Sequence, residues 1–414
     1  MNPEVLAYPF LFVAIFFESF ILVTLLSAPA RYGRARRFVP GSITPSVAIV
    51  VPCFNEAVTL TQTTESLLAL HYPTDRLSVI LVNDGSKDDT AAAMAKFAGH
   101  PQVRIIHKEN GGKHTALNAG IAVTDSEIVG CLDADSFVES DALAEIIPCF
   151  EKQNVAAVTA AMSVAKPSTI LQHMQNAEYI FGITVRHVLS SVNGLYVTPG
   201  PFSLYRREIV VALGGFRSGH QTEDMEMALR LQKHGFAIEN APRARVYTKT
   251  PRTLMGLIRQ RTRWTSGFLR NVLGEYRDLV GNARHGALGC LVLPVGLVSI
   301  FGAIVLFSNS LFLLARHALA APALRSGVPL SYSLVPSAHT LDWFYAPLDL
   351  FPALALLTVL AAIALIAIGK RLSRTPGSLT LGLLSYLLLY GVVAPLWLMR
   401  ATADVVTGTH RSWR

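Results

Sequence analysis

Two aspartates separated by one alanine, Asp133 and Asp135, follow an apolar run that begins at Glu127. Alternate side chains of a strand point to the same face, so both carboxylates are expected on one side where the run stops. Adjacent carboxylates repel each other, and a divalent cation is the usual reason for such a pair. Mg²⁺ and Mn²⁺ take oxygen ligands, commonly one or two carboxylates together with substrate phosphates. A solvated acidic turn is the alternative, so the pair alone does not establish a metal site.

A scaffold for these acids is visible between residues 46 and 132, where β-branched runs alternate with helical patterns. Strands are predicted at 46–53, 77–82, 103–108 and 127–132, and helices at 59–70, 90–97 and 114–122. Strands joined by helical crossovers form a parallel sheet, which binds ligands outside the carboxyl ends of its strands. Polar residues follow three of these strands: Asn55 with Glu56, the run from Asn83 to Ser86, and the aspartate pair. Their shared position indicates one site, and the missing GxGxxG argues against a dinucleotide.

Two further motifs have both a chemical and an ordinary structural interpretation. The glycine turn from Asn110 to Lys113 leads into a predicted helix, where backbone N–H groups and a lysine can bind phosphate. A plain helix start is equally consistent with it. Thr222, Glu223 and Asp224 precede a helical run, where acids often serve only as an N-cap.

Two amphipathic helices are predicted at about 171–187 and 253–276. Their apolar stripes suit packing on a core or on a membrane surface. The second helix is rich in arginine, which favours an interfacial position leading to the bilayer. Gln260, Arg263 and Trp264 also fit a ligand site, because an arginine fork can hold a diphosphate and an indole face can hold a sugar ring.

The composition indicates a membrane protein. Hydrophobic residues make up 51% of the 414 residues, and the mean hydropathy is +0.40. Four stretches are long and apolar enough to cross a bilayer as helices: 5–28, 288–315, 350–369 and 379–399. We expect the first to be a retained anchor, because its apolar part is long and no A-x-A-like cleavage site follows. The second stretch has the alternatives of a partly interfacial segment or a hairpin of two short helices.

The net charge of +8 does not indicate nucleic acid, because the basic residues gather at the ends of the apolar stretches. Arg31 to Arg37 and Lys370 to Arg374 have the pattern of cytoplasmic flanks under the positive-inside rule. The basic tail from Arg400 to Arg414 conflicts with that rule if three spans follow a cytoplasmic domain. The four cysteines lie in apolar runs without CxxC spacing, which predicts buried free thiols.

These motifs occur in a characteristic order: VPCFNEA, VNDGS, NGGKHTALNAG, DAD at 133–135, TED at 222–224 and QRTRW at 260–264. With flanking membrane spans, the set resembles the processive inverting membrane glycosyltransferases, the synthases of cellulose, chitin, hyaluronan and poly-N-acetylglucosamine. The resemblance covers about residues 45–270 in motif, and the region from TED to QRTRW looks nearest to bacterial poly-N-acetylglucosamine synthases. It implies a GT-A nucleotide-diphospho-sugar transferase domain of α/β class, with amphipathic interfacial helices and an α-helical transmembrane region.

The resemblance also implies roles for individual residues. Asp84 would contact the uridine, Asp133 the ribose or diphosphate, and Asp135 would hold Mg²⁺ or Mn²⁺, with Asp133 as the second metal-site acid. Asp224 would be the general base, and Trp264 would meet the acceptor with Thr222 and Glu223 beside it. Donor binding would also involve Glu56, Lys113, Gln260 and Arg263.

The expected organisation is an anchor at 1–30, a cytoplasmic transferase domain at 45–245, interfacial helices at 246–285 and transmembrane helices at 286–402. The expected function is polymerisation of a UDP-sugar, first of all UDP-N-acetylglucosamine, into a β-linked polysaccharide passed through the bacterial inner (plasma) membrane. Alternatives are a non-processive lipid glycosyltransferase, a hyaluronan-, chitin-oligosaccharide- or cellulose-type synthase, and a membrane scaffold with an inert transferase domain. With four spans, a polymer channel would be narrow or completed by a second copy or a small partner subunit.

Overall fold

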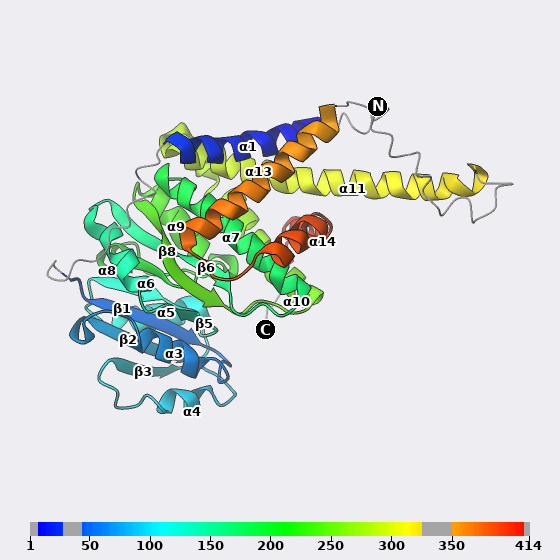
Figure 1. Ribbon diagram of the computed structural model, residues 1–414. Helices are drawn as coiled ribbons and strands as arrows, with labels where there is room; N and C mark the ends of the chain where they lie inside the picture. Colours follow the sequence, from blue (N-terminus) through cyan, green and yellow to red (C-terminus); the bar gives the residue numbers. More distant parts are fainter. Residues whose placement is uncertain (1–6, 28–43, 325–349, 410–414) are drawn as a thin grey trace.

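The computed structural model describes residues 7–27, 44–324 and 350–409, and within them a sheet of eight strands forms the central layer shown in Figure 1. The strand order is β3-β2-β1-β4-β7-β6-β8-β5. The strands are β1 (Val47–Cys53), β2 (Leu77–Asp84), β3 (Val103–Lys108), β4 (Ile128–Cys131), β5 (Ser136–Val138), β6 (Val155–Val164), β7 (Ser203–Arg206) and β8 (Ala237–Thr248).

The first four strands pair in parallel, as the alternating pattern predicted. β7 then runs antiparallel to both β4 and β6, and β5 runs antiparallel to β8, so the complete sheet is mixed. β1 and β2 are buried on both faces, which explains why they read as continuous apolar runs. Alternate residues of β1 belong to different cores: Ala48 and Val50 pack on one face, and Ile49 and Val51 on the other.

Helices cover both faces of this sheet. They are α3 (Leu60–Leu68), α4 (Thr90–Ala95), α5 (Lys113–Ala122), α6 (Ala142–Ile146), α7 (Ile170–Ser191), α8 (Arg207–Ala212), α9 (Glu223–Lys233) and α10 (Leu254–Arg270). Short 3₁₀ turns are η1 (Thr74–Arg76), η2 (Ile147–Glu151), η3 (Gly219–Gln221), η5 (Arg277–Leu279) and η6 (Ala283–His285), and π-helical turns are η4 (Asn271–Glu275) and η7 (Leu288–Val292). The two predicted amphipathic helices are α7 and α10. Each begins at a threonine N-cap whose hydroxyl accepts a backbone hydrogen bond, Thr169 for α7 and Thr253 for α10.

Four long apolar helices lie on one side of the sheet domain (Figure 1): α1 (Tyr8–Ser27), α11 (Leu293–Leu324), α13 (Leu350–Ser373) and α14 (Thr380–Val406). Within the described residues, four candidate spans have the length and composition to cross a membrane: Tyr8–Ser27, Leu288–Arg316, Pro352–Ser373 and Thr380–Val406. Large apolar side chains such as Phe12 and Leu388 are exposed on them, as expected for surfaces that face lipid. α7 connects the two parts, since it contacts β6 and β8 as well as α13 and α14.

Two sequence expectations need correction. The hairpin alternative for 288–315 is wrong, because η7 continues directly into the single helix α11. The expectation of four buried thiols is also wrong: all four are free, but Cys149 is only half-buried and Cys290 is exposed. The basic flank at 31–37 and the end of the tail, 410–414, lie outside the described residues, as do parts of the predicted anchor at 1–30.

Candidate active site

The predicted polar motifs meet at one edge of the sheet. β1 is paired in parallel with β2 and with β4, with Cys53 opposite Asn83 and Val50 opposite Cys131. The residues that follow these strands therefore emerge side by side, as the sequence predicted. The geometry of the aspartate pair differs from the prediction, because β4 ends at Cys131 and a turn contains both acids. The N–H of Ser136 donates to the carbonyl of Asp133 at 2.9 Å and closes this turn.

Asp84 lies at the end of β2 and is bonded within the protein. Its carboxylate is almost fully buried and lies 2.7 Å from the ammonium group of Lys108. The N–H groups of Gly111 and Gly112 donate to its two oxygens, both at 2.9 Å. Gly112 has a φ of 91°, a conformation that favours glycine. Asp84 therefore fixes the glycine turn that starts α5, and the expected uridine contact stays a prediction.

Lys113, the first residue of α5, joins two of the predicted motifs. Its ammonium group lies 2.6 Å from Oδ1 of Asp133 and 2.9 Å from Oε1 of Glu223. Burial lowers the pKa of Lys113, but these two carboxylates raise it more, so the net shift is upward and the lysine stays charged. A Cβ on Gly200 would lie 2.5 Å from Nζ of Lys113 and 2.8 Å from Oδ2 of Asp133, so a side chain there would disrupt the pair. No sequence motif indicated a place for Gly200 beside these residues.

Asp135 has the properties of an acid that a cation would stabilise. Burial, the charge of Asp133 and the charge of Glu56 raise its pKa to about 7, while the Ser136 hydroxyl donates to its Oδ1 at 3.1 Å. Among the described residues, no group of three His, Cys, Asp or Glu side chains could hold a metal ion. One or two carboxylates completed by substrate phosphates is the arrangement that Mg²⁺ commonly takes, and the acids present fit it. Asp133 is already paired with Lys113, so Asp135 is the stronger candidate ligand.

Asp224 lies in the first turn of α9, next to Glu223. Burial and the neighbouring charge of Glu223 raise its pKa to about 6. The N–H of Met225 donates to its Oδ1 at 2.8 Å, and the hydroxyl of Thr198 donates to its backbone carbonyl at 2.7 Å. Glu223 has a lowered pKa: burial raises it, but the charge of Lys113 outweighs that effect. The pKa values of the two adjacent acids therefore shift in opposite directions. Asp224, whose pKa is raised, is the acid suited to exchange a proton near neutral pH.

α10 packs directly on the TED segment. A Cβ on Gly267 would overlap the side chain of Thr222, so the helix approaches the segment as closely as a glycine permits. The side-chain amide of Asn271 donates to the carbonyl of Gly219 at 3.1 Å and to the hydroxyl of Thr222 at 3.2 Å. Two motifs separated by almost forty residues in the sequence are therefore one packed unit.

Substituting Gly267 with alanine is expected to push α10 away from Thr222. The overlap should lower the free energy of unfolding by about 1–3 kcal/mol and also lower the rate of sugar transfer. Gly274→Ala is the matched control, because a Cβ there meets nothing within 4 Å. Thermal unfolding and transfer assays on both variants test this, and equal behaviour of the two would rule out a tight contact at Gly267.

The three predicted residues of α10 have different surroundings. Arg263 lines a cavity of about 400 Å³ together with Ser266 and Glu226, and its charge acts on Glu223. Oε1 of Gln260 is buried and has no hydrogen-bond partner among the described residues, so it can accept a bond from a ligand. Trp264 is half-buried and packs against the core that contains β1 and β6.

The same helix contains Arg261, which the motif analysis did not assign to the site. Its side chain is 8% exposed, pairs with Glu178 and lies over the ring of Trp264. The helix contains several arginines, and nothing in the sequence distinguishes Arg261 from the others as the one that contacts Glu178 and Trp264.

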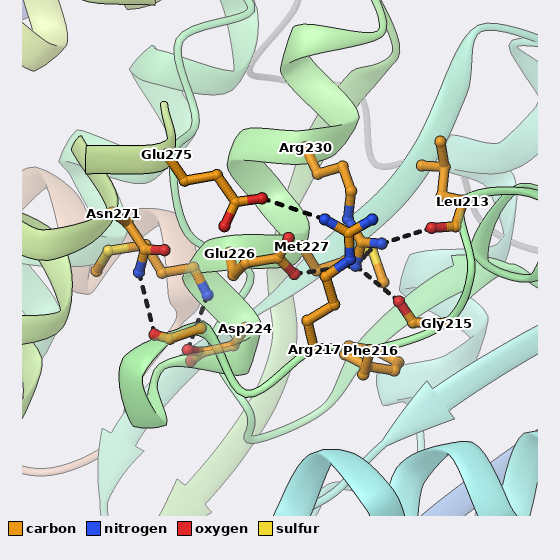
Figure 2. A network of polar contacts seen from close by, with 12 residues as sticks. Leu213, Gly215, Phe216, Arg217, Asp224, Glu226, Met227, Arg230, Asn271 and Glu275 are labelled. Atoms are coloured by element: carbon orange, nitrogen blue, oxygen red, sulfur yellow. Dashed lines mark hydrogen bonds and ion pairs between the residues drawn. The ribbon is translucent and has the colours of Figure 1, made fainter. Parts of the chain in front are cut away.

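A second buried ion pair holds the segment that precedes TED (Figure 2). Arg230 pairs with Glu226 at 2.9 Å within α9 and donates to the carbonyl groups of Leu213 and Gly215. The hydroxyl of Tyr276 donates to the other oxygen of Glu226 at 2.6 Å. The pair therefore connects α9, the preceding loop and the segment after α10, which restricts how the TED segment can move.

The family and the curated relatives that resemble this chain are glycosyltransferases. Residues 45–267 match the family model described as Glycosyltransferase like family 2. Curated poly-beta-1,6-N-acetyl-D-glucosamine synthases of Staphylococcus epidermidis and Staphylococcus aureus (strain COL) are each 32% identical to the chain, over 225 and 241 residues. These matches cover 53% and 58% of this chain and 54% and 58% of the relatives, so the chain spans little more than half the length of those proteins.

A solved structure resembles nearly the whole chain. It is the mannosyltransferase PcManGT from Pyrobaculum calidifontis in complex with GDP-Man and Mn²⁺. The TM-score is 0.64, and the match covers 98% of this chain and 99% of that one at 20% sequence identity. At this identity the likeness concerns the fold.

Proposed function

Because the chain belongs to the family described as Glycosyltransferase like family 2, we propose that it is a processive polysaccharide synthase. Its mixed-sheet, GT-A-like fold and the four apolar helices of its described residues agree with the fold class predicted from the sequence. In this proposal it transfers a sugar from a UDP-sugar, first of all UDP-N-acetylglucosamine, to a growing β-linked chain. The observation that carries the proposal is the packing of the QxxRW helix on the TED segment, where Gly267 meets Thr222. The helix that bears the candidate acceptor residue, Trp264, thus contacts the segment that bears the candidate base.

The proposed reaction is a single displacement. Asp224 accepts the proton of an acceptor hydroxyl while that oxygen attacks the anomeric carbon from the face opposite UDP, which inverts the centre. Lys113, Arg263 and Gln260 hold the diphosphate and the sugar, and Asp84 and Glu56 border the nucleotide. Asp135, with Asp133 beside it, would hold Mg²⁺ or Mn²⁺, which when bound supplies Lewis-acid stabilisation of the leaving UDP. No covalent intermediate on the protein is required.

The proposed domain organisation follows the sequence prediction: an anchor at 1–30, a cytoplasmic transferase domain at 45–245, interfacial helices at 246–285 and transmembrane helices at 286–402. In this arrangement the protein is a multi-pass protein of the inner membrane. The polymer leaves through the four apolar helices, alone or completed by a second copy or a small partner subunit. α7 contacts both the sheet and the apolar helices, which supports a short path for the polymer from the proposed transfer site to the membrane.

The test is a transfer assay with purified protein in detergent or nanodiscs. Individual radiolabelled UDP-sugars are supplied with Mn²⁺ or Mg²⁺, and the products are sized on a gel. A β-linked polymer from UDP-N-acetylglucosamine is the expected product. A polymer from another donor alone would refute the donor assignment, and a lipid that carries a single sugar would refute processivity.

The proposed base predicts a specific pH dependence. Asp224 must be deprotonated to accept a proton, and its pKa is raised to about 6. The transfer rate is therefore expected to be constant at higher pH and to fall about tenfold for each pH unit below 6. The measurement is the rate at saturating donor and metal, so that binding of the metal does not limit it. A rate that stays flat down to about pH 4.5 would exclude Asp224 as the base.

A further inference from the structure

Arg261 and Glu178 form a buried ion pair between α10 and α7. The guanidinium NH2 lies 2.7 Å from Oε2 of Glu178, and the two side chains are 8% and 17% exposed. Burying both charges is costly unless geometry and hydrogen bonds compensate, so such a pair is weak evidence of a stabilising role. Arg263, two residues along the helix, instead faces the cavity described above, so the two arginines have separate surroundings.

The guanidinium contacts two aromatic rings. Its central carbon is 4.3 Å from the centroid of Trp264 and 5.5 Å from that of Tyr179. A planar cation stacked on an indole interacts most strongly where water is excluded, as it is here. One face of the Trp264 indole is thereby covered, so at most the opposite face remains for a sugar ring.

The contacts continue into a membrane helix. Tyr390 lies on α14, which packs against both α7 and α10, and its hydroxyl is near enough to Glu178 to favour the ionised carboxylate. The ring of Tyr390 lies 4.7 Å from Tyr386 and 5.7 Å from Trp397 between centroids. The charge of Asp135 acts on Tyr179, the second ring beside the guanidinium. The ion pair and its aromatic neighbours therefore connect the indole of Trp264 with a candidate span.

We propose that the Arg261–Glu178 pair is a positioning device that fixes the indole of Trp264 for the acceptor sugar, with Tyr390 anchoring the pair to α14. The inference rests on the proposed function, in which Trp264 contacts the acceptor. Neither Arg261 nor Glu178 contacts a reacting atom in it. Removal of the device should affect use of the acceptor and leave use of the donor nearly unchanged, because the groups around Asp133 and Lys113 stay in place.

The principal variant is Arg261→Met, with Arg259→Met as its control because Arg259 is exposed on the same helix. A β-linked N-acetylglucosamine tetrasaccharide serves as acceptor. Loss of the fixed indole should raise the acceptor KM or lower the transfer rate by about 10- to 100-fold and shorten the product. Slow hydrolysis of the donor without acceptor should stay within about twofold, as should all rates of the control. Arg261→Lys, which keeps the charge but loses the planar group, should give a smaller defect of the same kind.

A double variant separates positioning from stability. Glu178→Gln alone leaves a buried guanidinium without its carboxylate and should lower the melting temperature. Combining it with Arg261→Met removes both charges and should restore the melting temperature but not acceptor use. Recovery of both would mean that the pair only stabilises the fold. Normal acceptor KM and product length in Arg261→Met, with altered values in Trp264→Phe, would also overturn the proposal.

Tryptophan fluorescence gives a readout that does not depend on activity. The emission of Trp264 is obtained as the difference between the wild type and Trp264→Phe. Arg261→Met should shift and depolarise this emission, since the indole loses its stacked cation. Unchanged emission would refute the positioning role even if the wild type transferred no sugar from any UDP-sugar, a result that would refute the proposed function separately.

Discussion

Asp224→Asn is expected to lower the rate of sugar transfer by about 10²- to 10⁴-fold, the range typical for loss of a positioned general base. The amide has the same shape as the carboxylate and can still accept the hydrogen bond from the N–H of Met225. Its backbone carbonyl still accepts from Thr198. The fold and the donor site should therefore persist, and the loss should appear in kcat with the donor KM nearly unchanged.

The matched control is Asp278→Asn. Asp278 pairs with Lys233 at the other end of α9, and its side chain is half exposed. Exposed pairs of this kind contribute little, so this variant should keep its stability to within about 1 kcal/mol and transfer sugar normally. Kinetics with saturating donor, together with a binding measurement for UDP, distinguish loss of the base from loss of binding. If Asp224→Asn retained more than about a tenth of the wild-type rate, another group would have to be the general base.

The sequence predicted where the site lies because the rule that locates it is local. Parallel strands end at a common edge, so residues that follow 46–53, 77–82 and 127–132 had to meet there. It did not predict which partner each side chain takes. Lys113 bridges Asp133 and Glu223, and Arg261 pairs with Glu178. Those pairings depend on how α5, α7, α9 and α10 pack, and no periodicity encodes that packing.

Two signals for the packing were nevertheless present in the sequence. Gly267 lies inside a helical pattern, where glycine costs stability and usually indicates close approach of another segment. Its contact with Thr222 is such an approach. Gly200, in the turn before β7, has the same explanation, because Lys113 and Asp133 occupy the space of a side chain. Alternation along a strand predicts one face for both aspartates only while the chain stays extended, and β4 ends two residues before Asp133.

Asp135→Asn is expected to lower metal-dependent transfer by at least about 10²-fold, since it removes the candidate ligand for the cation that stabilises leaving UDP. Chelation of metal from the wild type should have a similar effect, reversed by Mn²⁺ or Mg²⁺. In the variant, added metal should not restore the rate at concentrations that saturate the wild type. Asp141→Asn, a substitution of an exposed acid in the same region, is the matched control and should behave as the wild type.

Asp135→Asn should lower activity without destabilising the metal-free protein. This combination distinguishes loss of a metal ligand from damage to the fold. Burial and the charges of Asp133 and Glu56 raise the pKa of Asp135 to about 7, so ionised Asp135 is unfavourable in the fold above that pH. Asparagine cannot ionise, and the metal-free variant should melt at the same or a higher temperature at pH 8. Metal with UDP at about 100 times its Kd should stabilise the wild type by about 2.7 kcal/mol and the variant much less. A variant that melts lower than the wild type without metal, yet gains as much from metal and UDP, would show that Asp135 supports the fold and that the cation binds elsewhere.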